Sequence, residues 1–454
     1  MRQVTAAGAN GDRRFALQAV SVLATKIVML ASGLLASVVL ARALGPGALG
    51  VYTAVFALIT VVLTLADLGI RQAVTYLMGG RRAPDATVVS NLLAFLVLGS
   101  VLATTLAAGI LWMGPARAYG AGVLLPALAS VPLLLAITYV KGVALAKGWI
   151  RRLNLVDLWQ RAAFLILLTV FVLAAGMGVA GATLAYFVGA AVGAAFSWSW
   201  LRRVAPLRIA IDKDVARRLL GLGLTYAVVL FALNLNYRVD VLLIERLLSA
   251  EAVGLYAVGV RFAELVWQLP AAVGVVLFSA SARAETGRAA VARTARVLRT
   301  TLPLVVIVCI GITAVAPWLL PALFGPVFTA SVTATRLLMP GVVSAVVFKV
   351  LYADVAGRGR PTDGLWVFAP LAAANVVLNL MWIPTYGIEG AAVATTVTYL
   401  VGAVAFGWRY ACREGIGARE LLVARRSDLA VLLRRGAPLR RRRAGRPESG
   451  RLDA

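Results

Sequence analysis

The sequence predicts an all-α integral membrane protein with about twelve transmembrane helices in two parallel six-helix repeats. Three observations support this prediction. Hydrophobic residues make up 61% of the 454-residue chain, whereas a soluble globular protein is nearer one half apolar. They gather in runs that reach the roughly 20 residues a helix needs to cross a bilayer core. Short motifs also recur in the two halves of the chain.

Each predicted span rests on one of these apolar runs. The third and ninth, NLLAFLVLGSVLATTLAAGILWMG and TLPLVVIVCIGITAVAPWLLPALFG, contain no charged residue, and a buried helix of a soluble protein usually keeps a polar face. The span edges are set only to within about 2–4 residues. In order, the spans lie near residues 15–40, 50–70, 88–112, 120–141, 158–177, 179–201, 219–243, 252–278, 301–322, 335–354, 363–384 and 388–411.

The positions of Lys and Arg predict the orientation of these spans. A net charge of +26 could indicate nucleic-acid binding, but the charge is not spread evenly. Without the C-terminal tail, the N-terminus and the even-numbered connections carry 23 Lys and Arg residues. The odd-numbered connections carry only Arg42, Arg117, Arg246 and Arg336. Because cytoplasmic loops retain positive charge, we expect a multi-pass protein of the plasma (inner) membrane with both termini in the cytoplasm and no nucleic-acid partner.

Three parts of the chain follow from this topology: an N-terminal six-helix lobe (1–210), a C-terminal six-helix lobe (211–412) and a basic cytoplasmic tail (413–454). The tail segment LLVARRSDLAVLLRR could form an amphipathic helix on anionic membrane lipid. Nucleic-acid binding by the tail is a less favoured alternative. The connection from Ser281 to Thr300 likewise predicts a cytoplasmic interfacial helix.

The two lobes are predicted to be repeats because three motif pairs recur in the same order. The connector between Arg42 and Tyr52 matches the one between Arg246 and Tyr256 at an offset of 204 residues. GVAGATLA matches GIEGAAVA at an offset of 209, and LAKG resembles AGRG at an offset of 211. Chance matching of Gly- and Ala-rich sequence is the alternative. Repeats six spans apart keep the same orientation, and we expect the connector tyrosines to anchor at the membrane interface.

Several segments resemble a known group of transporters. They are RALGPGALGVY with LADLGI, NLNYRVDVLLIERLLSAEAVGLYAVGVRFAELVWQLP, and NVVLNLMWIPTYGIEGAAVATTVTYL. They resemble the polysaccharide transporters, the Wzx-type flippases of the multidrug/oligosaccharidyl-lipid/polysaccharide (MOP) superfamily. This resemblance implies a two-lobed transporter that flips an undecaprenyl-diphosphate-linked oligosaccharide from the cytoplasmic to the outer leaflet. It also implies a cationic central cavity and, for some members, coupling to an ion gradient.

Charged residues inside spans cost several kcal/mol and need a reason. Lys26, Arg238, Arg261 and Lys349 could surround a central cavity and bind the diphosphate. In the alternative interpretation, Arg261 only pairs with Glu264, three residues later on the same helix face. Arg238 and Lys349 would then reach the two membrane surfaces.

Carboxylates and amides complete the predicted site. Glu264 or Asp240 could couple transport to a proton or sodium gradient, and Asp67 is expected to act with Arg71 in structure or gating. Asn234 and Asn236 lie on the same span as Asp240. Two further amides, Asn375 and Asn379, could line the cavity or tie helices together, and the second role is favoured.

Other classes of function fit the sequence less well. The chain has no histidine and only two cysteines, Cys309 and Cys412, so neither a metal cluster nor a catalytic imidazole is expected. We therefore expect no enzymatic activity and no cofactor. The rivals are a multidrug and toxin extrusion antiporter, a lipid II flippase, and a membrane-bound enzyme or scaffold of polysaccharide assembly. Membrane lipids and polysaccharide polymerase or assembly proteins are the expected partners besides the lipid-linked oligosaccharide.

Overall fold

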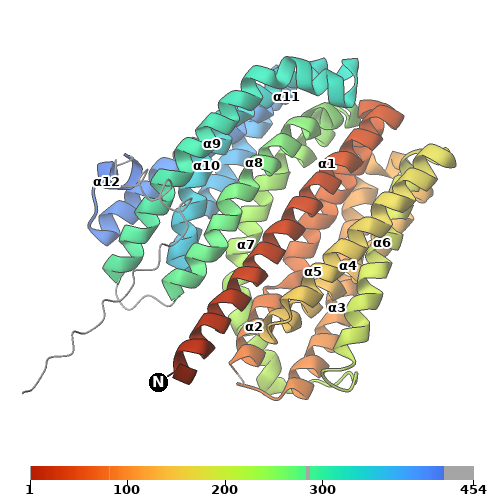
Figure 1. Cartoon of the computed structure of the whole chain (residues 1–454). Coiled ribbons are helices and arrows are strands. Elements are labelled where there is room, and N and C mark those ends of the chain that lie inside the picture. Colours follow the sequence, from red (N-terminus) through yellow and green to blue (C-terminus); the bar gives the residue numbers. More distant parts are fainter. Residues whose placement is uncertain (1, 81, 283–286, 424–454) are drawn as a thin grey trace, which may run out of the picture.

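The computed structural model describes residues 2–80, 82–282 and 287–423, without the side chains of residues 2–27, 30, 150, 275–276, 279–280, 282, 289, 361 and 418. The described part of the chain is helical, with no strand (Figure 1). Its long helices are α1 (Arg2–Asp67), α3 (Asp85–Met113), α4 (Ala121–Ala146), α5 (Ile150–Leu168), α6 (Gly178–Leu201), α7 (Lys213–Leu247), α8 (Ala250–Ala282), α9 (Gly287–Phe324), α10 (Ser331–Gly357) and α11 (Leu365–Glu414). Shorter elements are α2 (Ile70–Gly79), η1 (Pro115–Tyr119), η2 (Thr169–Ala174), η3 (Pro326–Ala330), η4 (Pro361–Gly364) and α12 (Ala418–Leu422).

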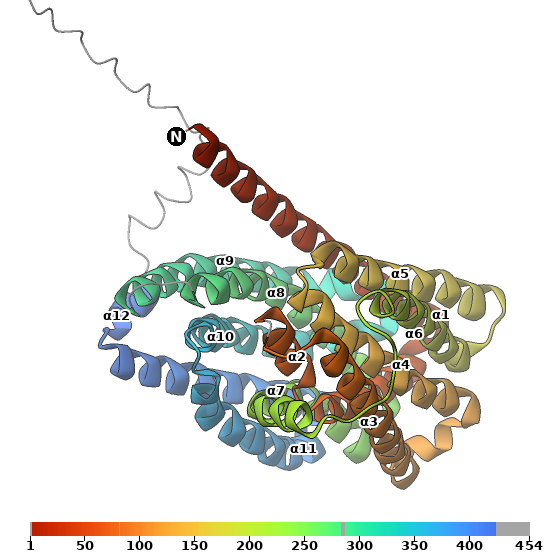
Figure 2. The same ribbon diagram turned by 90° about the horizontal axis from the view of Figure 1, so that it is seen from below.

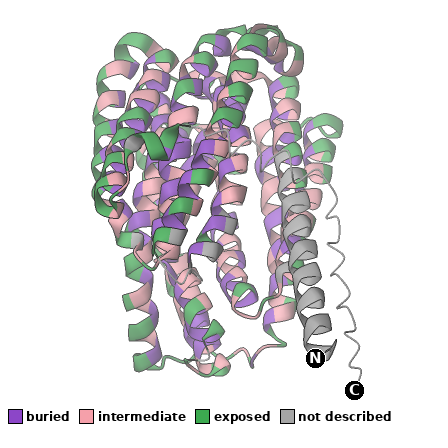
Figure 3. Cartoon of the chain, turned by 60° about the vertical axis from the view of Figure 1, so that its left-hand side comes forward, coloured by how far each residue is buried: buried purple, intermediate pink, exposed green. Residues whose placement is uncertain are grey.

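Ten helices among the described residues are long and apolar enough to cross a membrane. Two of them, α1 and α11, are each a pair of helices joined at a non-helical glycine, Gly45 (φ 78°) and Gly387 (φ 61°). Separating the pairs at these glycines gives twelve membrane-spanning segments, which is the predicted number. Their outward faces carry most of the exposed residues (Figure 3), as expected for a protein whose apolar surface meets lipid.

The backbone conformations support the predicted repeat. Gly178 and Gly387, which begin the matched motifs GVAGATLA and GIEGAAVA, have φ values of 60° and 61°. Gly148 and Gly359, which end LAKG and AGRG, have φ values of 68° and 79°. Positive φ is strained for any residue with a Cβ atom. The motifs therefore recur because each copy of the six-helix unit needs the same turns.

The two copies lie side by side. Seen from below, α3–α6 are on one side and α9–α12 on the other (Figure 2). Because the helices alternate in direction, the turns at Gly45, η1, η3 and Gly387 share one end of the molecule, which we call the connector end. The N-terminus and α2 lie at the other end (Figure 1), and we call this the basic end after its arginine-rich turns.

At the connector end the two copies of the repeated connector pack directly against each other. A Cβ atom on Gly50 would lie 1.5 Å from the Ala250 carbonyl oxygen, and one on Gly254 would lie 1.8 Å from the Pro46 oxygen. Gly50 is the repeat equivalent of Gly254, and Pro46 is that of Ala250. The two contacts are thus related by the internal symmetry. We call residues 42–52 and 246–256 the paired connectors.

Two polar contacts reinforce this closure between the halves. The Arg42 guanidinium donates to the backbone carbonyls of Ala322 and Leu323 near the end of α9. The Tyr119 hydroxyl donates to the Glu245 carboxylate at 2.7 Å. Burial, together with the hydrogen bond to this carboxylate, raises the pKa of Tyr119. The hydroxyl therefore keeps its proton and remains a donor at neutral pH.

The connector tyrosines do not lie at the membrane interface, where the sequence predicts them. Tyr52 and Tyr256 are 7% and 0% exposed, so they belong to the core of the protein and do not anchor at the membrane interface. The connection predicted to form an interfacial helix over Ser281–Thr300 is helical from Gly287 onward, where it is the first part of α9, the helix that continues into the ninth span. The predicted amphipathic tail helix lies, from residue 424, outside the described residues.

We expect Gly50→Ala to lower the free energy of unfolding by about 1–3 kcal/mol, the usual cost of overpacking, because the added methyl would meet a backbone carbonyl that cannot rotate away. Gly109→Ala on α3 is the control, since a Cβ atom there meets nothing within 4 Å, and it should be neutral or slightly stabilising. Thermal unfolding in detergent measures both variants. Equal stability of the two would contradict the paired packing.

Candidate substrate cavity

Two adjoining hollows lie between the halves, on the basic side of the paired connectors. The first is about 400 Å³ in volume and is lined by side chains of α1, α2 and α4–α7. The second is about 390 Å³ and is lined by α1, α5, α8 and α10. Met29 and Arg161 line both hollows, so we treat the two as one central cavity that both halves enclose.

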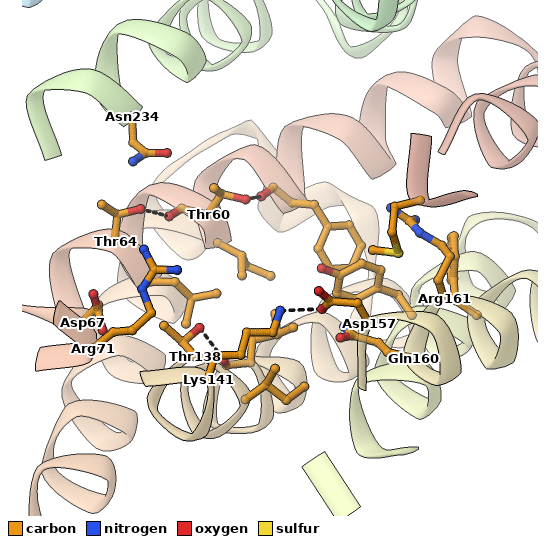
Figure 4. Close-up of a pocket in the computed structure, with 18 of the residues that line it drawn as sticks. Thr60, Thr64, Asp67, Arg71, Thr138, Lys141, Asp157, Gln160, Arg161 and Asn234 are labelled. Carbon is orange, nitrogen blue, oxygen red and sulfur yellow. Dashed lines mark hydrogen bonds and ion pairs between the residues drawn. The ribbon is translucent and has the colours of Figure 1, made fainter. Parts of the chain in front are cut away.

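The first hollow contains charged side chains from four helices, α1, α2, α4 and α5 (Figure 4). Lys141 on α4 donates to Asp157 on α5 at 2.5 Å. Asp67 and Arg71 line the same hollow without a direct ion pair between them in the described structure. Asp67 is 8% exposed, and its Oδ1 has no hydrogen-bond partner among the described residues. The expected joint action of Asp67 and Arg71 stays a prediction.

Arg161 sits at the junction of the two hollows and differs from the other cavity cations. The described residues offer it neither an ion-pair partner nor a hydrogen-bond acceptor. Its guanidinium lies 5.6 Å from the centre of the Phe164 ring, and a Cβ atom on Gly33 would be 3.8 Å from its Nη2. Gly33 on α1 therefore lies beside this guanidinium, at the edge of the second hollow.

The second hollow is organised around one carboxylate. Glu264 on α8 accepts from Arg261 at 2.9 Å and lies 3.1 Å from Arg238 on α7. These side chains are 24%, 35% and 27% exposed, respectively. The sequence indicated the pairing of Arg261 with Glu264, but the contribution of Arg238 was missed. Arg238 thus forms an ion pair with the same carboxylate from a second helix.

Lys349 on α10 reaches the same hollow. Its ammonium donates to the Tyr237 hydroxyl at 2.8 Å and lies 4.5 Å from the ring centres of Tyr237 and Trp267. Such cation–π contacts stabilise a partly desolvated ammonium by about 0.5–2 kcal/mol. The Lys349 side chain thus lines the second hollow beside two aromatic rings, and its role in substrate binding stays a prediction.

The remaining carboxylate of the predicted site, Asp240, is 4% exposed. It accepts from the Tyr256 hydroxyl at 2.6 Å and from the Val241 amide at 2.8 Å. Tyr256 belongs to the second connector, so Asp240 links the cavity helix α7 to the connector end. Asn234 lines both the first hollow and a smaller one of about 110 Å³ beside Asp240. Asn236 is buried, and no described residue bonds to its Oδ1.

The last predicted residues lie away from the hollows or outside the description. Asn375 donates to Thr398 at 3.1 Å, and Asn379 donates to Asn375 at 3.0 Å. They tie the two segments of α11 together and are not among the residues that line the central cavity. Lys26 is on α1, one helical turn before Met29, but its side chain is outside those that the structure describes.

Sequence reasoning missed part of the cavity lining. Neither Arg161, within the fifth predicted span, nor Lys141, at the end of the fourth, is among the site residues that the sequence predicts. Asp157, Gln160 and Arg161 all face the first hollow (Figure 4). Their three- and four-residue spacing at the start of a span is a polar stripe of the kind that marks a cavity-facing side, and it could have revealed this part of the site.

We expect Tyr256→Phe to lower the free energy of unfolding by about 1–3 kcal/mol, because it removes a hydrogen bond from a buried carboxylate. The repeat provides a matched control in Tyr52→Phe, since no described residue accepts a hydrogen bond from the Tyr52 hydroxyl. This control should lose less stability. Thermal unfolding of both variants in detergent tests the difference, and an equal loss would mean that the Asp240 contact contributes nothing.

Comparison with known proteins agrees with the fold. The family described as polysaccharide biosynthesis protein matches residues 39–333. Curated proteins give no significant match.

Solved structures of the same fold cover most of the chain. The lipid II flippase MurJ in an inward closed conformation is 12% identical, with a TM-score of 0.74 over 90% of each chain. An inward-facing multidrug resistance MATE family transporter of the MOP superfamily is 16% identical, with a TM-score of 0.65 over 87% of this chain and 98% of that one. A MOP superfamily transporter from Pyrococcus furiosus is 16% identical, with a TM-score of 0.55 over 88% of this chain and 95% of that one. The chain is thus a multi-pass membrane protein of the polysaccharide biosynthesis protein family, with the fold of the MOP superfamily transporters.

Proposed function

We propose that the protein flips a lipid-linked oligosaccharide, an undecaprenyl-diphosphate-linked repeat unit, from the cytoplasmic to the outer leaflet of the plasma membrane. The observation that carries this proposal is the position of Arg161. It lies where the two hollows meet, with no ion-pair partner among the described residues. A cation inside a membrane protein needs an anion, and a diphosphate headgroup would provide one through bidentate hydrogen bonds.

The charge balance of the cavity supports an anionic substrate. Its lining includes five basic residues, Arg71, Lys141, Arg161, Arg261 and Lys349, against three acidic ones, Asp67, Asp157 and Glu264. Each hollow falls within the roughly 300–1,000 Å³ of ordinary ligand sites. Together they offer room for a phosphorylated sugar headgroup, while the polyprenyl chain remains in the bilayer.

The positive-inside rule places the basic end in the cytoplasm. The cavity then lies on the cytoplasmic side of the paired connectors, which close it toward the outside. In alternating access, the headgroup enters from the cytoplasmic leaflet, the two halves rock, and the paired connectors separate to release it. A proton or sodium gradient is the proposed energy source, with Glu264 and Asp240 as the candidate coupling carboxylates.

A multidrug antiporter for organic cations is the less favoured function. Such a site would use aromatic rings and carboxylates to bind the cation, and the aromatic group beside this cavity contains Tyr237, Trp267 and Tyr399. Lys349 already occupies the faces of the first two rings. A positive side chain at that place would repel a cationic drug.

A lipid II flippase would use the same diphosphate chemistry as the proposed function. Because the likeness to MurJ is at 12% identity, it supports the fold and leaves the sugar carried by the lipid to experiment. Transport assays with lipid II and with other lipid-linked repeat units would separate the two.

Arg161→Gln should reduce transport about tenfold or more, because one charge-assisted hydrogen bond contributes about 1.5–3 kcal/mol. Arg161→Lys should keep part of the activity. The measurements are surface polysaccharide and the amount of lipid-linked repeat unit on the cytoplasmic leaflet in a deletion strain that carries each variant. Arg151→Gln, an exposed change at the start of α5, is the control. Normal export by Arg161→Gln at equal protein level would refute the role of Arg161.

Glu264→Gln should strengthen headgroup binding by about tenfold and slow its release, because Arg238 and Arg261 lose the carboxylate that competes with the substrate phosphate. Binding of a short-chain polyprenyl diphosphate to the purified protein, together with turnover in vesicles, measures both effects. Glu389→Gln removes the same charge from an exposed position on α11 and should change neither. Weaker binding by Glu264→Gln would show that this carboxylate supports the substrate and does not compete with it.

A further inference from the structure

Helix α9 is longer than its membrane span requires. Its 38 residues correspond to about 57 Å of helix, whereas a hydrocarbon core is about 30 Å thick. Pro303 and the apolar residues that follow it form the spanning part. The first turns of α9 therefore extend past the membrane core at the basic end, where lipid headgroups lie.

A large polar hollow lies beside these first turns. It has a volume of about 770 Å³, and its lining includes Arg288, Arg296 and Arg299 of α9 together with Glu414 and Glu420. Arg299 donates to the backbone carbonyl of Glu420 and so holds α12 against α9, where Figures 1 and 2 place it. Arg288 and Arg296 are exposed. This arginine hollow shares no lining residue with the central cavity, and none of its lining residues is part of the proposed transport site.

The acidic residues do not make the hollow unfavourable for an anion. Glu414 accepts from Arg358 at 2.8 Å and from Arg360 at 2.6 Å. Its charge is therefore compensated by two arginines that do not line the hollow. The three α9 arginines then face the single carboxylate of Glu420, and the field within the hollow favours a negatively charged group.

An apolar groove continues from the arginine hollow into the membrane-spanning part. It has a volume of about 690 Å³ and is lined by α9, α10, the second segment of α11, and α12. Gly415 and Ile416 line both the groove and the arginine hollow. Leu302, which lines the groove, follows Arg299 by one helical turn. Trp408, also in the groove, is 72% exposed, so the groove is open to the lipid phase.

We propose that the arginine hollow and the apolar groove together bind one anionic phospholipid of the leaflet at the basic end. The phosphate would lie among Arg288, Arg296 and Arg299, and one acyl chain would follow the groove past Trp408. A soluble anion would leave the groove empty, whereas a neutral lipid or an apolar peptide would gain nothing from the arginines. Only a molecule with a negative head beside an apolar chain matches both parts.

Bound lipid would connect α9, α11 and α12 at the basic end of the second half. It would stabilise the conformation in which these helices are packed, by the mass-action effect of any ligand that binds the folded state. This inference is independent of what the central cavity carries.

The groove contains its own reporter position for a direct test. Cys412 is exposed and lines the groove, whereas Cys309 is buried. Bimane attached to Cys412 of the full-length chain can be titrated with phospholipids that carry brominated acyl chains, which quench it on contact. Brominated phosphatidylglycerol should quench at a mole fraction at least roughly tenfold lower than brominated phosphatidylcholine, since each of the two exposed arginines adds about a factor of five in affinity for anionic lipid.

Two variants test the binding of the lipid headgroup and that of the acyl chain separately. The double variant Arg288→Gln/Arg296→Gln should lose the preference for phosphatidylglycerol, whereas Arg203→Gln/Arg208→Gln, two exposed arginines of the α6–α7 loop, should keep it. Gly407→Leu should reduce quenching by both lipids, because a Cβ atom there has only ordinary contact with Val347, at 3.8 Å, and the larger side chain fills the groove.

Three results would overturn the proposal. Equal quenching by the two lipids would mean that only unspecific boundary lipid occupies the groove. An unchanged preference in the Arg288→Gln/Arg296→Gln variant would remove the arginines from the site. Competition by soluble glycerol phosphate at concentrations similar to those of the lipid would show a site for small anions that does not use the groove.

Discussion

The architecture depends on one contact, the direct backbone packing of the paired connectors. Gly50 meets Ala250 and Gly254 meets Pro46 so closely that no side chain fits between them. Because each contact is the repeat equivalent of the other, the two halves meet about a common axis at the connector end. Farther from this contact the halves enclose the hollows around Met29 and Arg161. A tight seal at one end and a cavity behind it are the two features that alternating access requires.

Most of the basic side chains in and beside the cavity have a partner within the protein, and one does not. Lys141 is paired with Asp157, Arg238 and Arg261 share Glu264, and Lys349 rests on two aromatic rings. These partners lower the cost of placing charge inside a membrane protein. Arg161 has no such partner among the described residues, and it lies at the junction of the hollows. In the proposed mechanism the substrate supplies the anion that the protein omits there.

The parts of this structure that depend on local chemistry could be predicted from the sequence. Span length is set by the bilayer and by the need to satisfy backbone groups within each helix, so the apolar runs identify the segments. The spacing of Arg261 and Glu264 likewise indicates their pairing. The contact of Arg238 with Glu264 and that of Tyr256 with Asp240 could not be predicted, because they depend on which faces of different helices meet. The connector glycines illustrate the same limit: their recurrence was visible, but its reason is a contact between copies 204 residues apart.

The central claim is that transport requires the paired connectors to separate. Cysteines placed at Gly47 and Glu251, in a Cys412→Ser background, would stand on the two connectors, and a Cβ atom at Gly47 has open space around it. Joining them with a short cleavable bifunctional thiol reagent should abolish translocation of the lipid-linked substrate, and cleaving the link should restore it. Undiminished translocation while the connectors remain joined would contradict this account.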